Sequence, residues 1–143
     1  MRFDKKWSDI LPSKRSMGDR DWGSEDVLAV SPNCLMMKRL FIKSGSKGGL
    51  QYHRKRVEAG FVVSGKLIIR LGLERHIEER ILTAGDWFIF EPGVVHQEEA
   101  IEDTVIIECS TPWINDRVRV EKYYGIDSNE GLPSTELGTE KLL

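Results

Sequence analysis

The stretch at residues 50–61, LQYHRKRVEAGF, holds three side chains that can ligate a metal ion. These are Gln51, His53 and Glu58, and a second histidine, His96, follows downstream in EPGVVHQEE. An imidazole, a carboxylate and an amide oxygen together suit a divalent transition metal such as Zn, Mn, Fe, Co or Ni. Two histidines with one carboxylate also describe the facial triad of non-haem iron enzymes. The residue types therefore predict a metal site before any fold is considered.

The spacing of these residues fits a site built on β-strands. Side chains alternate between the two faces of a strand, so Gln51 and His53 point the same way. Glu58 opens the next run after a basic turn, and His96 follows a Pro-Gly turn. We expect all four side chains to face one interior. His76 lies in the turn-like LERHIEER and is given no role, because a lone histidine is more often a structural residue.

The runs that would position these ligands read as strands. They are about six residues long, are bounded by Gly, Pro or charged turns, and read MKRLFIK, AGFVVSG, KLIIRLG, HIEERIL, GDWFIFEPG, VVHQEEA and TVIIECS. Strands at such regular spacing predict a β-sandwich or barrel. One short helix is expected near WINDRVRVEKYYG.

Length and composition indicate one domain. The chain has 143 residues, of which 40% are hydrophobic, and this size suits a single core. Residues 1–20 and 126–143 are polar and show no sustained period. We therefore expect an N-terminal arm, a domain over residues 21–125 and a C-terminal tail that the barrel does not need.

Composition also disfavours several classes of function. A net charge of -2 does not favour nucleic acid. The longest apolar runs are too short to cross a bilayer, and the N-terminus lacks the apolar core of a secretory signal. Cys34 and Cys109 have no metal-like spacing, and each is expected to be a small buried side chain. We therefore expect a protein of the reducing cytoplasm, with neither a nucleic acid nor a membrane as partner.

The order of these residues resembles the two motifs of the cupin superfamily. They run Gly49, His53, Glu58, Gly65 and then Gly85, Pro92, Gly93, His96. Gln51 stands where the first motif usually has a histidine, and Ala100 stands where the second usually ends in asparagine. The glycines and the proline make tight turns that aim the ligands inward. The resemblance implies an all-β, single-domain cupin, which is a double-stranded β-helix or jelly-roll barrel, with polar N- and C-terminal arms.

One branch of the superfamily, the cupin-type (type II) mannose-6-phosphate isomerases, is similar through its Gln-x-His-x-x-x-x-Glu pattern. The same domain forms the C-terminal part of bifunctional mannose-1-phosphate guanylyltransferases. The resemblance spans residues 21–125 and continues in DWGSEDVL, GFVVSGK, EPGVVHQEE and INDRVRVEKYYG. It implies a phosphosugar substrate and a metal held by Gln51, His53, Glu58 and His96. The chain departs from this branch at residues 54–56, where further histidines are common, and at Ile126, where arginine usually follows Tyr-Gly.

The function that the resemblance implies is metal-dependent isomerisation of a sugar phosphate between aldose and ketose. Glu98 lies two residues past His96 and should share its inward face, so Glu98 or Glu58 is the expected base that moves a proton between C1 and C2. Arg54 and Lys55 are the expected phosphate contacts. Two alternatives stay open, namely a solvated Glu98 at the barrel mouth and a solvated basic turn.

Two other classes of function also stay open. A different metalloenzyme, such as a dioxygenase or a tailoring enzyme for nucleotide sugars, would be revealed by bound Fe(II) and O2 uptake. A non-catalytic sugar-binding cupin would show saturable binding without turnover. The expected partners are a small-molecule sugar or sugar phosphate and a second copy of the chain, because exposed sheet edges are otherwise a liability.

Overall fold

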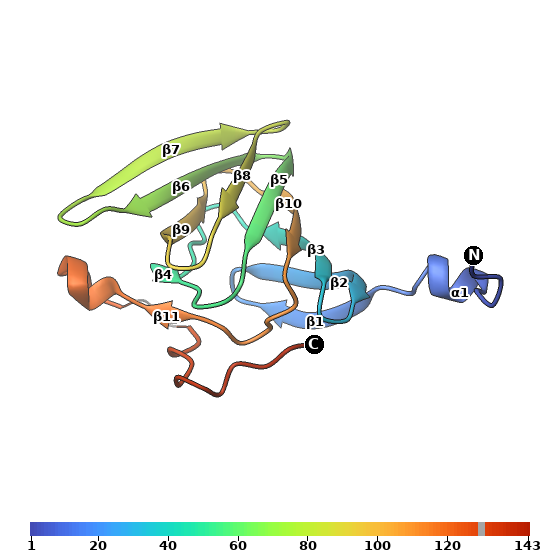
Figure 1. Cartoon of the computed structure of the whole chain (residues 1–143). Coiled ribbons are helices and arrows are strands. Elements are labelled where there is room, and N and C mark those ends of the chain that lie inside the picture. The colour runs from blue at the N-terminus through green and yellow to red at the C-terminus, as the bar shows by residue number, and fades with distance from the viewer. Residues whose placement is uncertain (129–130) are drawn as a thin grey trace.

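The computed structural model describes residues 1–128 and 131–143, and the chain folds mainly into antiparallel strands (Figure 1). The strands are β1 (Arg15–Arg20), β2 (Gly23–Ser31), β3 (Leu35–Ile42), β4 (Gln51–Tyr52), β5 (Glu58–Ser64), β6 (Lys66–Gly72), β7 (Ile77–Thr83), β8 (Trp87–Phe90), β9 (Val95–Ala100), β10 (Thr104–Ser110) and β11 (Val118–Arg119). A short helix α1 (Trp7–Ile10) precedes them, and the 3-10 helix η1 (Glu121–Tyr124) follows them, within the segment where a helix was expected.

The strands form two sheets. One has the order β1-β2-β3-β10-β5-β8, and the other has the order β11-β4-β9-β6-β7. Sequence neighbours such as β4 and β5 lie in different sheets, which is the connectivity of a jelly roll. The expected all-β, single-domain barrel is therefore confirmed, and its two sheets supply the walls of one interior.

The core lies between the two sheets and follows strand alternation. In β5, Val62 is fully buried, while its neighbours Phe61 and Val63 are 47% and 46% exposed. Leu67 of β6 and Ile106 of β10 belong to the same buried cluster. Burying an aliphatic side chain of this size stabilises a fold by about 1.5–3 kcal/mol. These inward positions therefore hold the two sheets together.

Two of the motif glycines make turns that carry the site. Gly65 joins β5 to β6 with a φ of +90°, and a Cβ there would collide with the carbonyl of Asp103. Gly93 has a φ of +87° in the turn before β9. Its N–H donates to the carbonyl oxygen of His53 at 2.8 Å. This turn therefore ties the two sequence motifs to each other.

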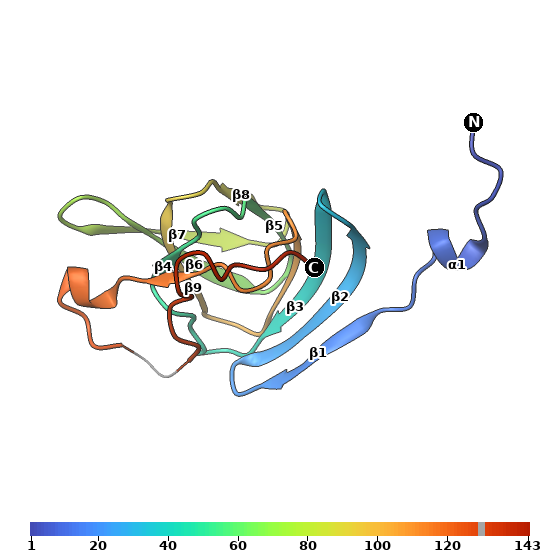
Figure 2. The same cartoon turned by 60° about the horizontal axis from the view of Figure 1, so that its bottom comes forward.

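Both ends of the chain contact the barrel more than a polar composition suggests. β1 pairs with β2, so the sheet begins at Arg15 inside the expected arm. The tail, residues 126–143, was expected to be dispensable. In its segment 131–143, however, the Thr135 N–H donates to the Arg117 carbonyl at 2.8 Å, and the Lys141 carbonyl accepts from the Ile114 N–H at 3.0 Å. The boundaries at residues 20 and 125 stay a prediction. Figure 2 shows the remaining N-terminal arm with α1 projecting away from the barrel.

The expectation for the cysteines is wrong, because both are exposed. Cys109 lies between the buried residues Glu108 and Ser110 of β10, so alternation turns it to the outer face of the sheet. Across the described part of the chain, no helix has the length and apolar character needed to span a membrane.

Candidate metal centre

His53, Glu58 and His96 meet in the barrel interior. His53 is the first residue of the β4–β5 loop, Glu58 begins β5, and His96 lies on β9 of the opposite sheet. One potential ligand atom from each residue lies within 4.8 Å of the other two. The three residues are only 3%, 5% and 2% exposed. The expected convergence of these three residues is therefore present in the structure.

The ring nitrogens of both histidines are arranged for metal binding. The Nδ1 of His53 pairs with the backbone carbonyl of Asp116, and the Nδ1 of His96 pairs with the carbonyl of Val94 at 2.9 Å. A carbonyl can only accept, so each Nδ1 carries a proton, and in the neutral form of either ring the lone pair lies on Nε2. Burial lowers the pKa of His96 despite the nearby charge of Glu58, which favours the neutral ring that ligates metals.

The residues present fit a divalent cation. The Nε2 of His53 is buried and, among the described residues, has no hydrogen-bond partner. It lies 3.4 Å from Oε2 of Glu58, which also accepts from Nη1 of Arg56 at 3.1 Å. Burial by itself would raise the pKa of Glu58, but His53 and Arg56 outweigh it, and the pKa lies well below its usual value. Two imidazoles and one carboxylate are a donor set for Zn, Mn, Fe, Co or Ni.

Gln51, the fourth expected ligand, lies beside this group. Its Cα is directly opposite that of His96 in the pairing of β4 with β9. Direct partners in an antiparallel pair place their side chains on the same face. A ligand role for Gln51 stays a prediction, and its position beside His96 suits that role.

Glu98 occupies the interior face of β9, as alternation from His96 predicts. It is half-buried and lies opposite Ile69, a core residue of β6. Burial, together with the negative charges of Glu58 and Glu108, raises the pKa of Glu98 to about 8. A carboxyl group with such a pKa exchanges its proton near neutral pH, which is a property that general acids and bases need.

Several inward charges were missed or left unassigned by the sequence analysis. Lys38 of β3 lies 2.6 Å from Glu108 of β10 and 2.9 Å from Glu25 of β2, measured from its Nζ to a carboxylate oxygen. Burial opposes its charge, but the two carboxylates outweigh burial and raise the pKa of Lys38. Alternation in TVIIECS puts Glu108 on the same face as Ile106, and this was an available signal for an inward acid. The interior is therefore polar near the metal group, the cluster formed by His53, Glu58 and His96.

Asp116 is a second residue that the sequence analysis missed. Its buried carboxylate accepts the backbone N–H groups of Arg54, Lys55 and Arg56 at 3.1, 2.6 and 2.8 Å. Burial alone would raise the pKa of Asp116, but these three N–H groups lower it. Because the same residue also binds the ring of His53, it positions both the ligand and the loop that follows it.

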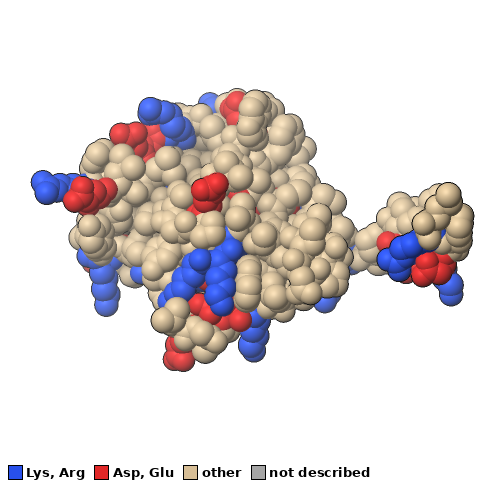
Figure 3. All heavy atoms as spheres, in the orientation of Figure 1, with Lys and Arg blue, Asp and Glu red and all other residues tan. Residues whose placement is uncertain are grey.

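Arg54 and Lys55, the expected phosphate contacts, lie against the C-terminal segment. Arg54 Nη1 is 3.2 Å from Oε1 of Glu140, and Lys55 Nζ is 3.3 Å from its Oε2. Lys55 also lies over the ring of Trp113, 4.5 Å from its centroid. Figure 3 shows Lys and Arg side chains with acidic ones beside them in the lower part of this face, where the β4–β5 loop and the C-terminal segment run. The phosphate role of the two residues stays a prediction, and in this structure they hold a carboxylate.

Residues 39–108 match the family of Cupin domains (Cupin_2). The matched range includes His53, Glu58 and His96. The chain carries a cupin domain. No curated protein matches it. The cupin resemblance stated from the sequence is therefore confirmed at the level of the domain.

Solved structures share the cupin fold. KdgF from Halomonas sp. is 24% identical over 68% of this chain and 87% of its own, with a TM-score of 0.59. The capsular polysaccharide assembling protein CapF from Staphylococcus aureus is 22% identical over 80% of this chain and 34% of its own, with a TM-score of 0.68. An RmlC-like cupin from Shewanella frigidimarina is 22% identical over 69% of this chain and 84% of its own, with a TM-score of 0.60. At these identities the likeness establishes the fold.

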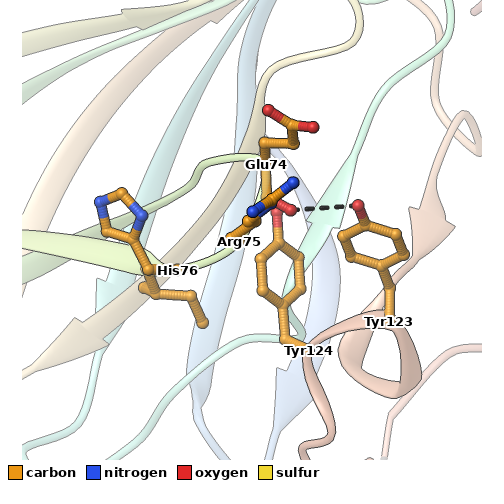
Figure 4. A pocket seen from close by; sticks show the side chains of 6 residues that line it. Glu74, Arg75, His76, Tyr123 and Tyr124 are labelled. Atoms are coloured by element: carbon orange, nitrogen blue, oxygen red, sulfur yellow. Dashed lines mark hydrogen bonds between the residues drawn. The ribbon is translucent and has the colours of Figure 1, made fainter.

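A separate cavity of about 460 Å³ lies on the outside of the cupin barrel. Figure 4 shows Tyr123 and Tyr124 of η1 beside the β6–β7 hairpin. The hydroxyl of Tyr123 donates to the Glu74 carbonyl at 3.1 Å, and that of Tyr124 to the Leu73 carbonyl at 2.8 Å. His76 lines this cavity and is not part of the metal group, in agreement with giving it no role there. The two tyrosines fasten η1 to the hairpin.

Proposed function

We propose that this cupin is a metal-dependent isomerase that interconverts the aldose and ketose forms of a sugar phosphate of the mannose-6-phosphate type. The observation that carries the proposal is the placement of Glu98 on the interior face of β9, two residues from His96. A proton-transferring carboxyl group therefore shares one polar interior with a group of metal ligands. The sequence resemblance to the type II isomerases supplies the class of substrate.

Each interior residue has a defined part in this proposal. Gln51, His53, Glu58 and His96 would hold the divalent metal, which when bound supplies Lewis-acid polarisation of the substrate's carbonyl and hydroxyl oxygens. Glu98 as a carboxylate takes the proton from C2 of the aldose, and the C–H electron pair forms the C1–C2 double bond while the carbonyl electron pair moves to O1. The proton of the C2 hydroxyl passes to O1, Glu98 returns its own proton to C1, and the C2–O double bond forms, which gives the ketose.

Glu58 is the poorer choice for this base. Arg56 already donates to its carboxylate, and its pKa lies well below the usual value. A weakly basic carboxylate removes a carbon-bound proton inefficiently, whereas it serves well as an anionic ligand. We therefore assign Glu58 the role of metal ligand and Glu98 the role of base.

The contacts of Arg54 and Lys55 suit the phosphate role that we assign to them. Together they already hold both oxygens of the Glu140 carboxylate. A planar guanidinium and a point-like ammonium bind phosphate by the same chemistry. For a phosphate to take that place, the Glu140 side chain has to be displaced, so Glu140→Gln should lower the Michaelis constant for the phosphorylated sugar.

The test joins elemental analysis of the purified protein to an assay of mannose-6-phosphate and fructose-6-phosphate interconversion. We expect one divalent metal per chain and turnover that the double variant His53→Ala/His96→Ala abolishes. Saturable sugar binding without turnover would instead identify a non-catalytic sugar-binding cupin. Turnover that survives complete removal of the metal would contradict the proposal.

A second candidate function rests on the ligand types. His53, His96 and Glu58 match the ligand types of the facial triad of non-haem iron oxygenases, which is two histidines and one carboxylate. If the purified protein holds Fe(II) and consumes O2 with a sugar or nucleotide sugar, the dioxygenase or tailoring function replaces the isomerase. If the metal is redox-inert and O2 is not consumed, this candidate is excluded.

A further inference from the structure

The outer face of the six-stranded sheet is apolar along β5 and β8. Phe61 of β5 lies opposite Trp87 of β8 in the strand pairing, and Ile89 follows on the same face of β8. Trp87 and Ile89 are 75% and 62% exposed, while Phe61 and Val63 are about half exposed. β8 is an outermost strand of this sheet. A group of neighbouring exposed apolar side chains on an edge strand is typical of a protein interface.

The N-terminal arm, residues 1–14, also exposes large apolar side chains. Phe3, Trp7, Ile10 and Leu11 are 88%, 76%, 58% and 70% exposed. Within the described chain, no residue of α1 is buried. A helix of this length is not stable by itself in water, so its apolar side chains need a surface to cover them.

The arm and the apolar face belong to opposite edges of one sheet. The arm leads into β1, which is one outermost strand, and the apolar face ends at β8, which is the other. Figures 1 and 2 both show α1 projecting from the barrel beyond β1, apart from β8. We infer that the N-terminal arm of one chain docks on the β5–β8 face of a second copy of this chain. The arm of the second copy docks in the same way on the β5–β8 face of the first.

Charge and size agree with this occupant. Basic residues outnumber acidic ones in the arm, whereas two acidic residues flank β8. The arm holds Arg2, Lys5, Lys6 and Lys14 against Asp4 and Asp9, and the flanking acids are Asp86 and Glu91. A reciprocal arrangement uses each arm and each face once and closes with two-fold symmetry. With two aromatic side chains in each arm and two on each face, such a dimer buries roughly 1,000–2,000 Å² in all, the range of stable interfaces.

The test measures the mass of the intact chain by sedimentation velocity over a range of concentrations. We expect twice the chain mass of 16.4 kDa. The arm variant Phe3→Ser/Trp7→Ser and the face variant Trp87→Ser/Ile89→Thr should each raise the dimer dissociation constant at least about 30-fold, the effect of losing one interface hot spot. Ile81→Thr, a change on β7 at a residue that is 60% exposed, is the matched control and should leave the mass unchanged.

Mixing the two variants separates arm exchange from other dimers. In the mixed dimer the intact arm of the face variant meets the intact face of the arm variant, so the mixture should associate more tightly than either variant alone. Both variants should keep the secondary structure and metal content of the parent chain. A parent chain that is monomeric at about 100 μM, a concentration at which interfaces of this size form, overturns the inference. A dimer that neither variant weakens also overturns it, as does a mixture no tighter than its components.

Discussion

Asp116 contacts His53 through its backbone carbonyl and the loop after His53 through its side-chain carboxylate. Its backbone carbonyl pairs with the Nδ1 of His53, and its carboxylate accepts the N–H groups of the next three residues. One residue thus sets both the proton position of a metal ligand and the course of the chain toward Glu58. A change at Asp116 should therefore affect both the stability of the loop and the affinity of the candidate site for a metal.

The first prediction concerns Asp116→Asn. The amide keeps the size but turns one acceptor into a donor that faces backbone N–H groups, so the free energy of unfolding should fall by about 2–3 kcal/mol. Metal affinity should fall by about 10- to 100-fold, the usual effect of losing a group that orients a ligand. Thermal unfolding and a metal titration measure the two effects. Asp19→Asn, at an exposed position, is the control, and equal effects from both variants would show that the contacts of Asp116 are not special.

The second prediction concerns the metal group itself. His53→Ala/His96→Ala removes both imidazoles of a buried group and should abolish metal binding, because one carboxylate does not hold a transition metal tightly. Elemental analysis after dialysis provides the measurement. His76→Ala removes an exposed histidine outside the group and should leave metal content at the parent value. Stoichiometric metal in the double variant would show that the site is elsewhere.

The third prediction is a pH dependence of stability in the metal-free protein. The pKa of Glu98 is about 8 in the folded chain, raised above the value of about 4.5 of a free glutamate. Between these two values the folded state binds a proton that the unfolded state releases, so the contribution of Glu98 to stability is fully present below pH ~4.5 and is lost as pH rises through ~8. Denaturant unfolding at several pH values should show this decline. Glu98→Gln should flatten it, and a parallel decline in the variant would assign it to another group.

The fourth prediction concerns chemistry at Glu98. If Glu98 is the base, Glu98→Gln should keep the fold and the metal but lower turnover by about a hundredfold or more, the usual scale for a positioned acid or base. The Michaelis constant should change less, because the amide still forms hydrogen bonds. Glu99→Gln is the matched control on the outer face of β9. Turnover of Glu98→Gln within a factor of about three of the parent would remove Glu98 from the mechanism.

The fifth prediction concerns the C-terminal segment. Deleting residues 131–143 removes the carboxylate of Glu140 from Arg54 and Lys55, and the backbone contacts of Thr135 with Arg117. The melting temperature should therefore fall by several degrees, and metal affinity should weaken because the loop after His53 loses support. Thermal unfolding and metal titration of the truncated chain test this. An unchanged melting temperature would restore the sequence-based view of a dispensable tail.

The sequence determined which side chains face the barrel interior. Strand alternation and motif spacing placed His53, Glu58 and His96 together, and they placed Glu98 on the face of His96. Each of these inferences depends on a local rule, since the period of a strand and the turn at Gly93 are properties of a few adjacent residues. The expectation of a β-sandwich or barrel followed from the same local regularity, and the resemblance to the cupin motifs narrowed it to a jelly roll.

The tertiary structure alone decided which distant groups meet. Asp116 is 63 positions from His53 in the chain, and Glu140 is 86 positions from Arg54. Their encounters depend on how two sheets and a C-terminal segment close over one another, and no periodicity in the sequence encodes that closure. The buried pair of Lys38 and Glu108 has the same origin, because alternation gives a side chain its face but not its partner across the sheet.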